Sequence, residues 1–175
     1  MSEKNGEPPA SSAAESNESA VGSLPESCHP KIQAIFDYWR RIHPAQGLPG
    51  RQHFDPVDIP ALLANVYLID VAQDGAEFIF RLMGTRAEAF FGGNYTGKPV
   101  QNAYVTDHKS RTYADIAAML QDRLPRWRRG PTYYVRNREL AMVERLYVPL
   151  ARDGKTVDMI LGLVVARAVD SDFIC

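Results

Sequence analysis

Residues 78–100 read FIFRLMGTRAEAFFGGNYTGKPV, and within them Gly92, Gly97 and Lys98 have the G-x-x-x-x-G-K spacing of a phosphate-binding loop. Such a loop needs Ser or Thr after its lysine to ligate Mg2+, and it joins a strand to a helix. Here Pro99 follows the lysine, so a hydroxyl and a backbone N–H are both missing, and helical backbone is disfavoured just before it. The preceding TRAEAFF is typical of a short helix. We therefore interpret residues 92–99 as a turn-rich connector.

Apolar periodicity on both sides of this connector predicts the order of the elements. Runs typical of strands occur at residues 65–71, 77–83, 132–137, 139–150 and 156–168. Helical patterns occur at residues 30–43, 85–91 and from about 106 to about 123. Hairpins on each side of a helical insertion predict an α+β fold, namely a five-stranded antiparallel sheet with helices on one face, plus the N-terminal helix.

Composition divides the chain into a tail and a single domain. Residues 1–27 are rich in Ser, Glu, Ala and Pro and contain no aromatic residue, so we expect them to be disordered. Residues 28–170 are expected to form one domain. Residues 28–175 carry a mild positive excess that does not indicate nucleic acid. The apolar run at 159–166 is too short to cross a bilayer, and we expect a cytoplasmic protein without membrane insertion.

The opening stretch resembles a PAS domain, and more narrowly the variant PAS domain found as a nearly free-standing protein in alphaproteobacteria. The variant has Arg-Leu-x-Gly-Thr, then Phe or a similar residue, then Gly, then Thr-Gly-Lys or Thr-Gly-Arg. The chain matches it at Arg81, Leu82, Gly84, Thr85, Phe91, Gly92, Thr96, Gly97 and Lys98. The resemblance covers roughly residues 29–167. It implies two strands, a helical bundle across one sheet face, and three further strands.

The resemblance also implies a sensory or regulatory role in bacterial signalling without catalytic activity. PAS domains bind small molecules between sheet and helices, or they dimerise and dock signalling proteins. Enzyme motifs such as G-x-S-x-G and H-E-x-x-H are absent from the sequence. Candidate residues for a ligand pocket are Phe80, Leu82, Phe91, Tyr113, Met119 and Met142. Phe36 and Trp39 are the candidates for contact with a signalling partner or a second copy; the alternative is that they pack on the domain's own core.

Motifs for cofactor binding are weak, so we expect no cofactor, although haem or another small ligand stays open. A flavin photosensor of the light-oxygen-voltage kind needs an Asn-Cys-Arg motif, but the chain has Gly-Gly-Asn-Tyr at 92–95 and cysteines only at Cys28 and Cys175. A haem-binding PAS domain uses a His on its long helix. His108 lies near the start of that helix, among charged residues that suit a solvated or capping His. His29, His43 and His53 lack partners at metal-ligand spacing.

An arginine-rich stretch suggests an alternative function. Arg126, Arg128 and Arg129 flank Trp127, within a longer basic and aromatic region from Arg123 to Arg138. Arginine next to aromatic residues suits phosphate contact and base stacking, so these three are candidate anion contacts of a nucleotide- or RNA-binding module. The other reading is a solvated turn and edge strand, where charges discourage aggregation. On that reading nucleic acid is not a partner.

Overall fold

The computed structural model describes residues 17–20, 22–72, 75–104, 109–131 and 140–168. The helices and strands are β1 (Asn17–Ala20), α1 (Pro30–Arg41), β2 (Val66–Ala72), β3 (Glu77–Met83), α2 (Thr85–Phe91), α3 (Lys109–Asp122), β4 (Arg126–Pro131), β5 (Leu140–Leu150) and β6 (Met159–Ala168). Short 3-10 turns lie at Arg51–His53, Pro56–Asp58, Leu63–Asn65 and Val100–Ala103. Within these ranges, no helix is both long and apolar enough to cross a membrane.

The strands of the described residues belong to one antiparallel sheet, in the order β1-β4-β5-β6-β2-β3. This confirms the predicted α+β class and its antiparallel sheet. The strand predicted at 132–137 lies outside the described residues. The strand that precedes β5 is β4, an arginine-rich segment that lacks the apolar alternation on which the prediction rested.

A sixth strand, β1, comes from the segment that the composition predicts to be disordered. Its residues pair with β4 in the register Asn17↔Arg129 to Ala20↔Arg126. Strand pairing at a sheet edge uses main-chain hydrogen bonds, so it does not require the apolar side chains that the tail lacks. Residues 17–20 are thus paired at the sheet edge, residues 1–16 and 21 lie outside the described part of the chain, and the disorder of the tail stays a prediction.

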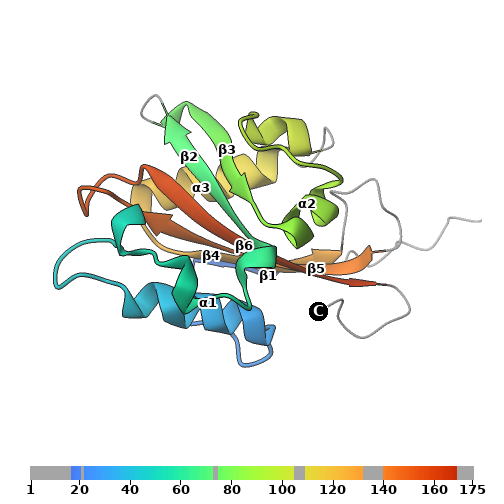
Figure 1. Ribbon diagram of the computed structural model, residues 1–175, viewed down its shortest axis with the longest axis horizontal. Coiled ribbons are helices and arrows are strands. Elements are labelled where there is room, and N and C mark those ends of the chain that lie inside the picture. Colours follow the sequence, from blue (N-terminus) through green and yellow to red (C-terminus); the bar gives the residue numbers. More distant parts are fainter. Residues whose placement is uncertain (1–16, 21, 73–74, 105–108, 132–139, 169–175) are drawn as a thin grey trace, which may run out of the picture.

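The two faces of the sheet are covered by different helices (Figure 1). α1 lies on one side, which we call the outer face, while α2 and α3 lie on the other, the inner face. α1 begins at Pro30, a residue favoured in the first turn of a helix, and the Nδ1 atom of His29 accepts a hydrogen bond from the Lys31 N–H at 3.0 Å. Burial lowers the pKa of His29, which favours the neutral imidazole that this acceptor role needs.

The apolar stripe of α1 packs on the sheet and is not available to a partner. Phe36 is only 2% exposed and Trp39 only 7%, and the indole N–H of Trp39 donates to the Pro149 carbonyl at 2.9 Å. The prediction of an interaction surface at these two residues is therefore wrong, and the alternative of packing on the domain's own core is confirmed. An amphipathic helix beside a sheet has the same pattern whether its apolar stripe faces its own core or a partner.

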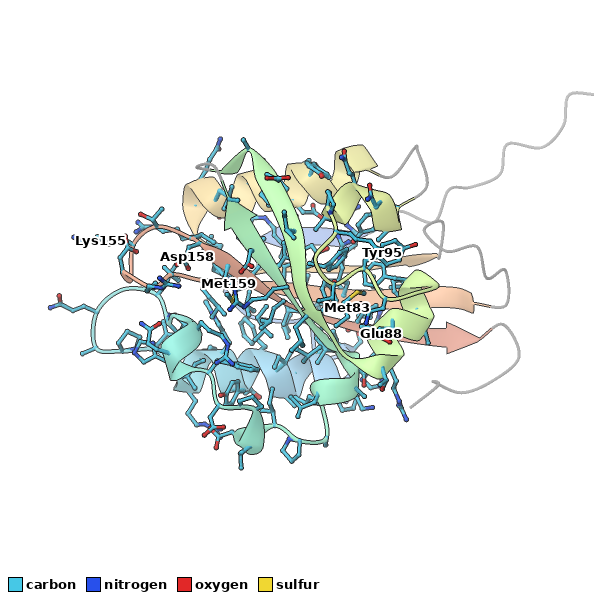
Figure 2. All side chains as sticks on the ribbon, turned by 45° about the horizontal axis from the view of Figure 1, so that its top comes forward. Met83, Glu88, Tyr95, Lys155, Asp158 and Met159 are labelled. Carbon is cyan, nitrogen blue, oxygen red and sulfur yellow. The ribbon has the colours of Figure 1, made fainter. Side chains whose placement is uncertain are left out.

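The stretch at 78–100 forms β3, α2 and a loop that returns to β3. α2 ends at Gly92, whose φ of +77° is the left-handed conformation that suits glycine after a helix. The loop then pairs with β3, since the Gly97 N–H donates to the Phe80 carbonyl at 2.7 Å and the Phe80 N–H donates to the Lys98 carbonyl at 3.0 Å. The Tyr95 N–H also reaches the Met83 sulfur at 3.2 Å (Figure 2). The predicted turn-rich connector is confirmed.

A β-bulge in β3 changes which residues face the core. Leu68 pairs with Leu82 and Ile69 with Phe80, so Arg81 is an extra residue without a partner on β2. Phe80 and Met83 are therefore both buried, although three positions separate them, and Leu82 is 49% exposed. Leu82 therefore does not point into the core beside Phe80, because simple alternation does not allow for the bulge. It lines a separate pocket together with Phe54 and Leu68.

The inner face is closely packed where β2 and β6 pair. Tyr67 lies opposite Gly162, and a Cβ atom added to that glycine would stand 2.4 Å from the tyrosine ring. The ring is fully buried and cannot move into solvent. Glycine is thus required at position 162 to admit Tyr67.

We expect Gly162→Ala to lower the free energy of unfolding by about 1–3 kcal/mol, because the added methyl group overpacks the core. Urea denaturation measures the change. Gly22→Ala is the matched control, since an added Cβ there meets nothing within 4 Å. An unfolding midpoint of Gly162→Ala equal to that of the wild type would contradict this packing account.

Candidate ligand site on the inner face of the sheet

Five aromatic side chains meet on the inner face, and we call them the inner cluster: Tyr67, Phe80, Phe91, Tyr104 and Tyr147. Phe91 is central, with ring centroids 5.4 Å from Tyr67, 5.4 Å from Phe80 and 5.7 Å from Tyr104. Tyr67 and Tyr147 lie 6.1 Å apart. These separations, with rings inclined at 62° to 87°, are typical of edge-to-face contacts. The structure therefore brings together two of the predicted pocket residues, Phe80 and Phe91.

The inner cluster carries three buried hydroxyl groups. The hydroxyls of Tyr104 and Tyr147 are 3.2 Å apart and share a hydrogen bond. The Tyr67 hydroxyl has the Tyr147 hydroxyl as a polar neighbour but makes no hydrogen bond of normal geometry within the described residues. Burial raises the pKa of all three phenols. They therefore remain neutral hydroxyls near neutral pH and can donate or accept hydrogen bonds.

A buried ion-pair network lies next to these hydroxyls and connects α3 to the sheet. Asp115 of α3 accepts a hydrogen bond from Arg145 on one carboxylate oxygen and from Arg128 on the other, each at 2.8 Å. Arg145 also donates to the Thr112 hydroxyl at 3.2 Å, and its guanidinium lies 4.3 Å from the centre of the Tyr147 ring. Arg145 thus links the ion pairs to the inner cluster.

The remaining predicted pocket residues do not join the inner cluster. Met119 is fully buried on α3, and Tyr113 is half-buried with its ring 5.2 Å from that of Phe78. Met142 is 36% exposed. The prediction that Met142 lines the ligand pocket is wrong. Met142 lies two residues before Glu144 on β5, so both side chains lie on the outer face.

Sequence reasoning missed the polar part of this site, namely Tyr67, Tyr104, Asp115, Thr112, Arg145 and Tyr147. A signal was present in β5, where Glu144 and Arg145 interrupt an otherwise apolar strand. Charged residues are rarely buried unless they are paired, so a charge on each face of a central strand indicates partners on both sides of the sheet. The identity of those partners, however, depends on the tertiary fold.

The predicted anion contacts are already engaged by carboxylates. Arg126 pairs with Asp122, Arg128 with Asp115, and Arg129 with Glu144 at 2.8 Å. The prediction that these three arginines form an anion-binding surface is therefore wrong. The alternative of a solvated edge is also wrong, because Arg126 and Arg128 are buried and β4 pairs with a strand on each side. Arg136 and Arg138 lie outside the described residues.

Glu144 is the outer-face counterpart of Arg145. Its buried carboxylate accepts hydrogen bonds from the backbone N–H of His29 at 2.8 Å and from the indole N–H of Trp127 at 2.9 Å, besides its pairing with Arg129. His29 is the residue just before α1. Glu144 therefore fixes the start of α1 to the middle of the sheet.

The described residues contain no group of three or more His, Cys, Asp or Glu side chains that could hold a metal ion. His43 contacts the Trp39 carbonyl at 2.8 Å, and His53 accepts from the Gly50 N–H at 3.0 Å, so both serve the local backbone. The haem candidate His108 lies outside the described residues. Cys28 lies beside Gln33 of α1, away from the inner cluster, so it could not bond to a flavin bound there.

Residues 27–165 match the family model of the PAS domain, and the chain belongs to that family. This confirms the identification made from residues 78–100. The fold is thus that of a class of sensory signalling domains.

Solved structures of similar shape include the LOV protein of Rhodobacter sphaeroides, with a TM-score of 0.48 and 14% identity over 80% of this chain and 69% of that one. An RNA-binding light-oxygen-voltage receptor also has a TM-score of 0.48, with 12% identity over 89% of this chain and 38% of that one. No curated protein matches the sequence significantly.

We expect Asp115→Asn to lower the free energy of unfolding by about 3 kcal/mol or more, because two buried guanidinium groups lose their shared carboxylate. Asp70→Asn is the control, since it breaks a more exposed ion pair. In that pair the Asp70 side chain is 34% exposed and the Arg81 side chain is 55% exposed. Exposed pairs contribute about 0–1 kcal/mol. Chemical denaturation compares the two variants, and equal small losses would contradict a structural role for the buried network.

Proposed function

We propose that this chain is a non-catalytic PAS-fold sensory protein of bacterial signalling that binds a small molecule at the inner cluster. It passes the signal to a signalling protein or to a second copy of itself. The observation that carries the proposal is the Tyr67 hydroxyl, which is buried and makes no hydrogen bond of normal geometry with the described residues.

An unsatisfied buried hydroxyl is unusual, because leaving it without a partner costs about 1–3 kcal/mol. A ligand with a hydroxyl or carbonyl group next to Tyr67 would remove this cost. The neighbouring Tyr104 and Tyr147 hydroxyls offer further contacts for the same end of the ligand. The rings of Phe80 and Phe91 offer apolar contacts for the rest of it, and few polar groups in a mainly apolar wall are typical of small-molecule sites. The ligand class is thus a small apolar molecule with one polar end.

The chemistry of the cluster favours binding over catalysis. A general base needs a pKa near the working pH, whereas burial raises the pKa of the three tyrosines above their ordinary value. Asp115 is committed to two arginines, which stabilise its charged form. The described part of the cluster therefore contains donors and acceptors but no poised nucleophile.

Strand β5 offers a route from the ligand to the outer face. Arg145 contacts the Tyr147 ring on the inner face, and its neighbour Glu144 holds the residue before α1 on the outer face. A ligand that moves Tyr147 or Arg145 would shift the backbone that also positions Glu144. α1 and the chain leading into it would then respond, which places the output on the side of the sheet opposite the ligand.

Native mass spectrometry of the freshly purified full chain tests the proposal, because it reports retained ligand and oligomeric state together. We expect the wild type to carry a small-molecule adduct that is lost in Tyr67→Phe. The free energy of unfolding of that variant should stay equal or rise by about 1 kcal/mol, since an unsatisfied hydroxyl is removed. Tyr113→Phe, outside the cluster, should keep the adduct.

The contrary result is a wild type without any adduct, together with a Tyr67→Phe variant that is clearly less stable. That pair of observations would mean that the Tyr67 hydroxyl has a structural partner, such as a buried water, and contributes to folding instead of ligand recognition.

A further inference from the structure

A cleft lies where α3 ends, apart from the inner cluster. Its volume is about 450 Å3, and it is bounded by the end of α3, by Val71 and Gly75, and by the turn between β5 and β6. Its polar lining includes Arg123, Gln121, Lys155 and Thr156, and its apolar lining includes Leu120 and Val157. Figure 2 shows Lys155 and Asp158 on the turn at the edge of the molecule.

Arg123 has an unusual backbone conformation at this cleft. Its φ is +60°, and it is the one non-glycine residue with positive φ in the part of the chain that the structure describes. It follows the last residue of α3, and its N–H donates to the Met119 carbonyl at 2.9 Å. Glycine is the usual residue at such a helix end, because a Cβ is strained there. The backbone conformation at position 123 therefore favours glycine over arginine.

The guanidinium of Arg123 also differs from its neighbours in its contacts. Arg126, Arg128 and Arg129 each pair with a carboxylate, whereas no described carboxylate pairs with Arg123. The Asp122 carboxylate, next to it in sequence, is occupied by Arg126 and by the Leu124 N–H. Within the described residues, the Arg123 guanidinium thus has no carboxylate partner at the cleft.

Lys155 provides a second positive charge from the opposite wall. Its backbone is held by Asp153, whose carboxylate accepts hydrogen bonds from the Lys155 N–H at 2.8 Å and the Thr156 N–H at 2.7 Å. Asp158 also lines the cleft, but its carboxylate accepts from the Arg152 N–H at 3.2 Å and lies 4.0 Å from the Arg152 guanidinium. Within the described residues, the Lys155 ammonium group has no ion-pair partner.

The geometry points to an anion-binding site for a small organic molecule that carries a phosphate or carboxylate group on an apolar body. The planar guanidinium of Arg123 can hold two oxygens of such a group, while the ammonium of Lys155 adds a second charge. The side-chain amide of Gln121 supplies a further hydrogen-bond donor at the same opening, whereas the Thr156 hydroxyl is hydrogen-bonded to Asp153. Leu120 and Val157 provide the apolar contact that distinguishes an organic anion from inorganic phosphate. No residue of this site belongs to the inner cluster, so the two proposals stand independently.

The test uses the full chain and three probes: hexyl phosphate, hexanoate and inorganic phosphate, each followed by isothermal titration calorimetry. Arg123→Gly removes the guanidinium and places the preferred residue at positive φ, so the variant should fold with an unchanged or higher melting temperature. Lys155→Gln removes the second charge. Arg86→Gln is the matched control, because it removes one exposed positive charge on α2, away from the cleft.

We expect saturable binding of hexyl phosphate or hexanoate that is tighter than binding of inorganic phosphate. Arg123→Gly and Lys155→Gln should each weaken it at least tenfold, and Arg86→Gln should leave it within twofold of the wild type. The proposal is overturned if none of the probes binds saturably, if Arg123→Gly binds like the wild type, or if Arg86→Gln weakens binding as much as the cleft variants do. Preference for hexyl phosphate over hexanoate, or the reverse, identifies the charged group that the site takes.

Discussion

Two adjacent charged residues in the middle of β5 are the constraint on which the rest of the structure depends. Side chains of neighbouring strand residues point to opposite faces of a sheet, so Glu144 is buried on the outer face and Arg145 on the inner face. Each buried charge costs several kcal/mol, on the order of the stability of a whole domain, unless it is paired and hydrogen-bonded. α3 supplies the Arg145 partners Asp115 and Thr112, and the chain at the start of α1 supplies a partner for Glu144. The two helical layers must therefore both be in place for the central strand to be stable.

This constraint gives a physical basis for a sensory role. Arg145 contacts the Tyr147 ring of the proposed ligand site, and Glu144 holds the residue before α1. A ligand shifts a conformational equilibrium only as far as it binds one state better than another. Here a ligand that reorganises the hydroxyls beside Arg145 would favour the arrangement of β5 to which it binds best. The position of Glu144 on the outer face would then change with the β5 backbone. The anion-binding site proposed at the end of α3 would act on a different part of the same helix.

Sequence reasoning could recover those parts of the fold that local patterns encode. The residues at 78–100 identified the family because their glycines, short helix and return to β3 are set by local backbone geometry. The extra residue Arg81, the pairing of β1 and the face of Met142 could not be derived, since each depends on the register between strands. The prediction of anion contacts at Arg126, Arg128 and Arg129 failed because a sequence shows the positive charges but not the carboxylates that pair with them. Of the five aromatic residues of the inner cluster, the two phenylalanines were named from the sequence and the three tyrosines were missed.

Native-state hydrogen exchange of the Thr112→Val variant tests the coupling between the two faces most directly. This change removes the Thr112 hydroxyl, which accepts a hydrogen bond from Arg145 and is also hydrogen-bonded to Tyr104 on the inner face. We expect the protection of backbone amides to fall in α1, across Ile32 to Trp39, as well as in α3. The loss of protection in each of these helices should exceed the loss in β3. A loss of protection confined to α3, with α1 exchanging as in the wild type, would contradict this coupling.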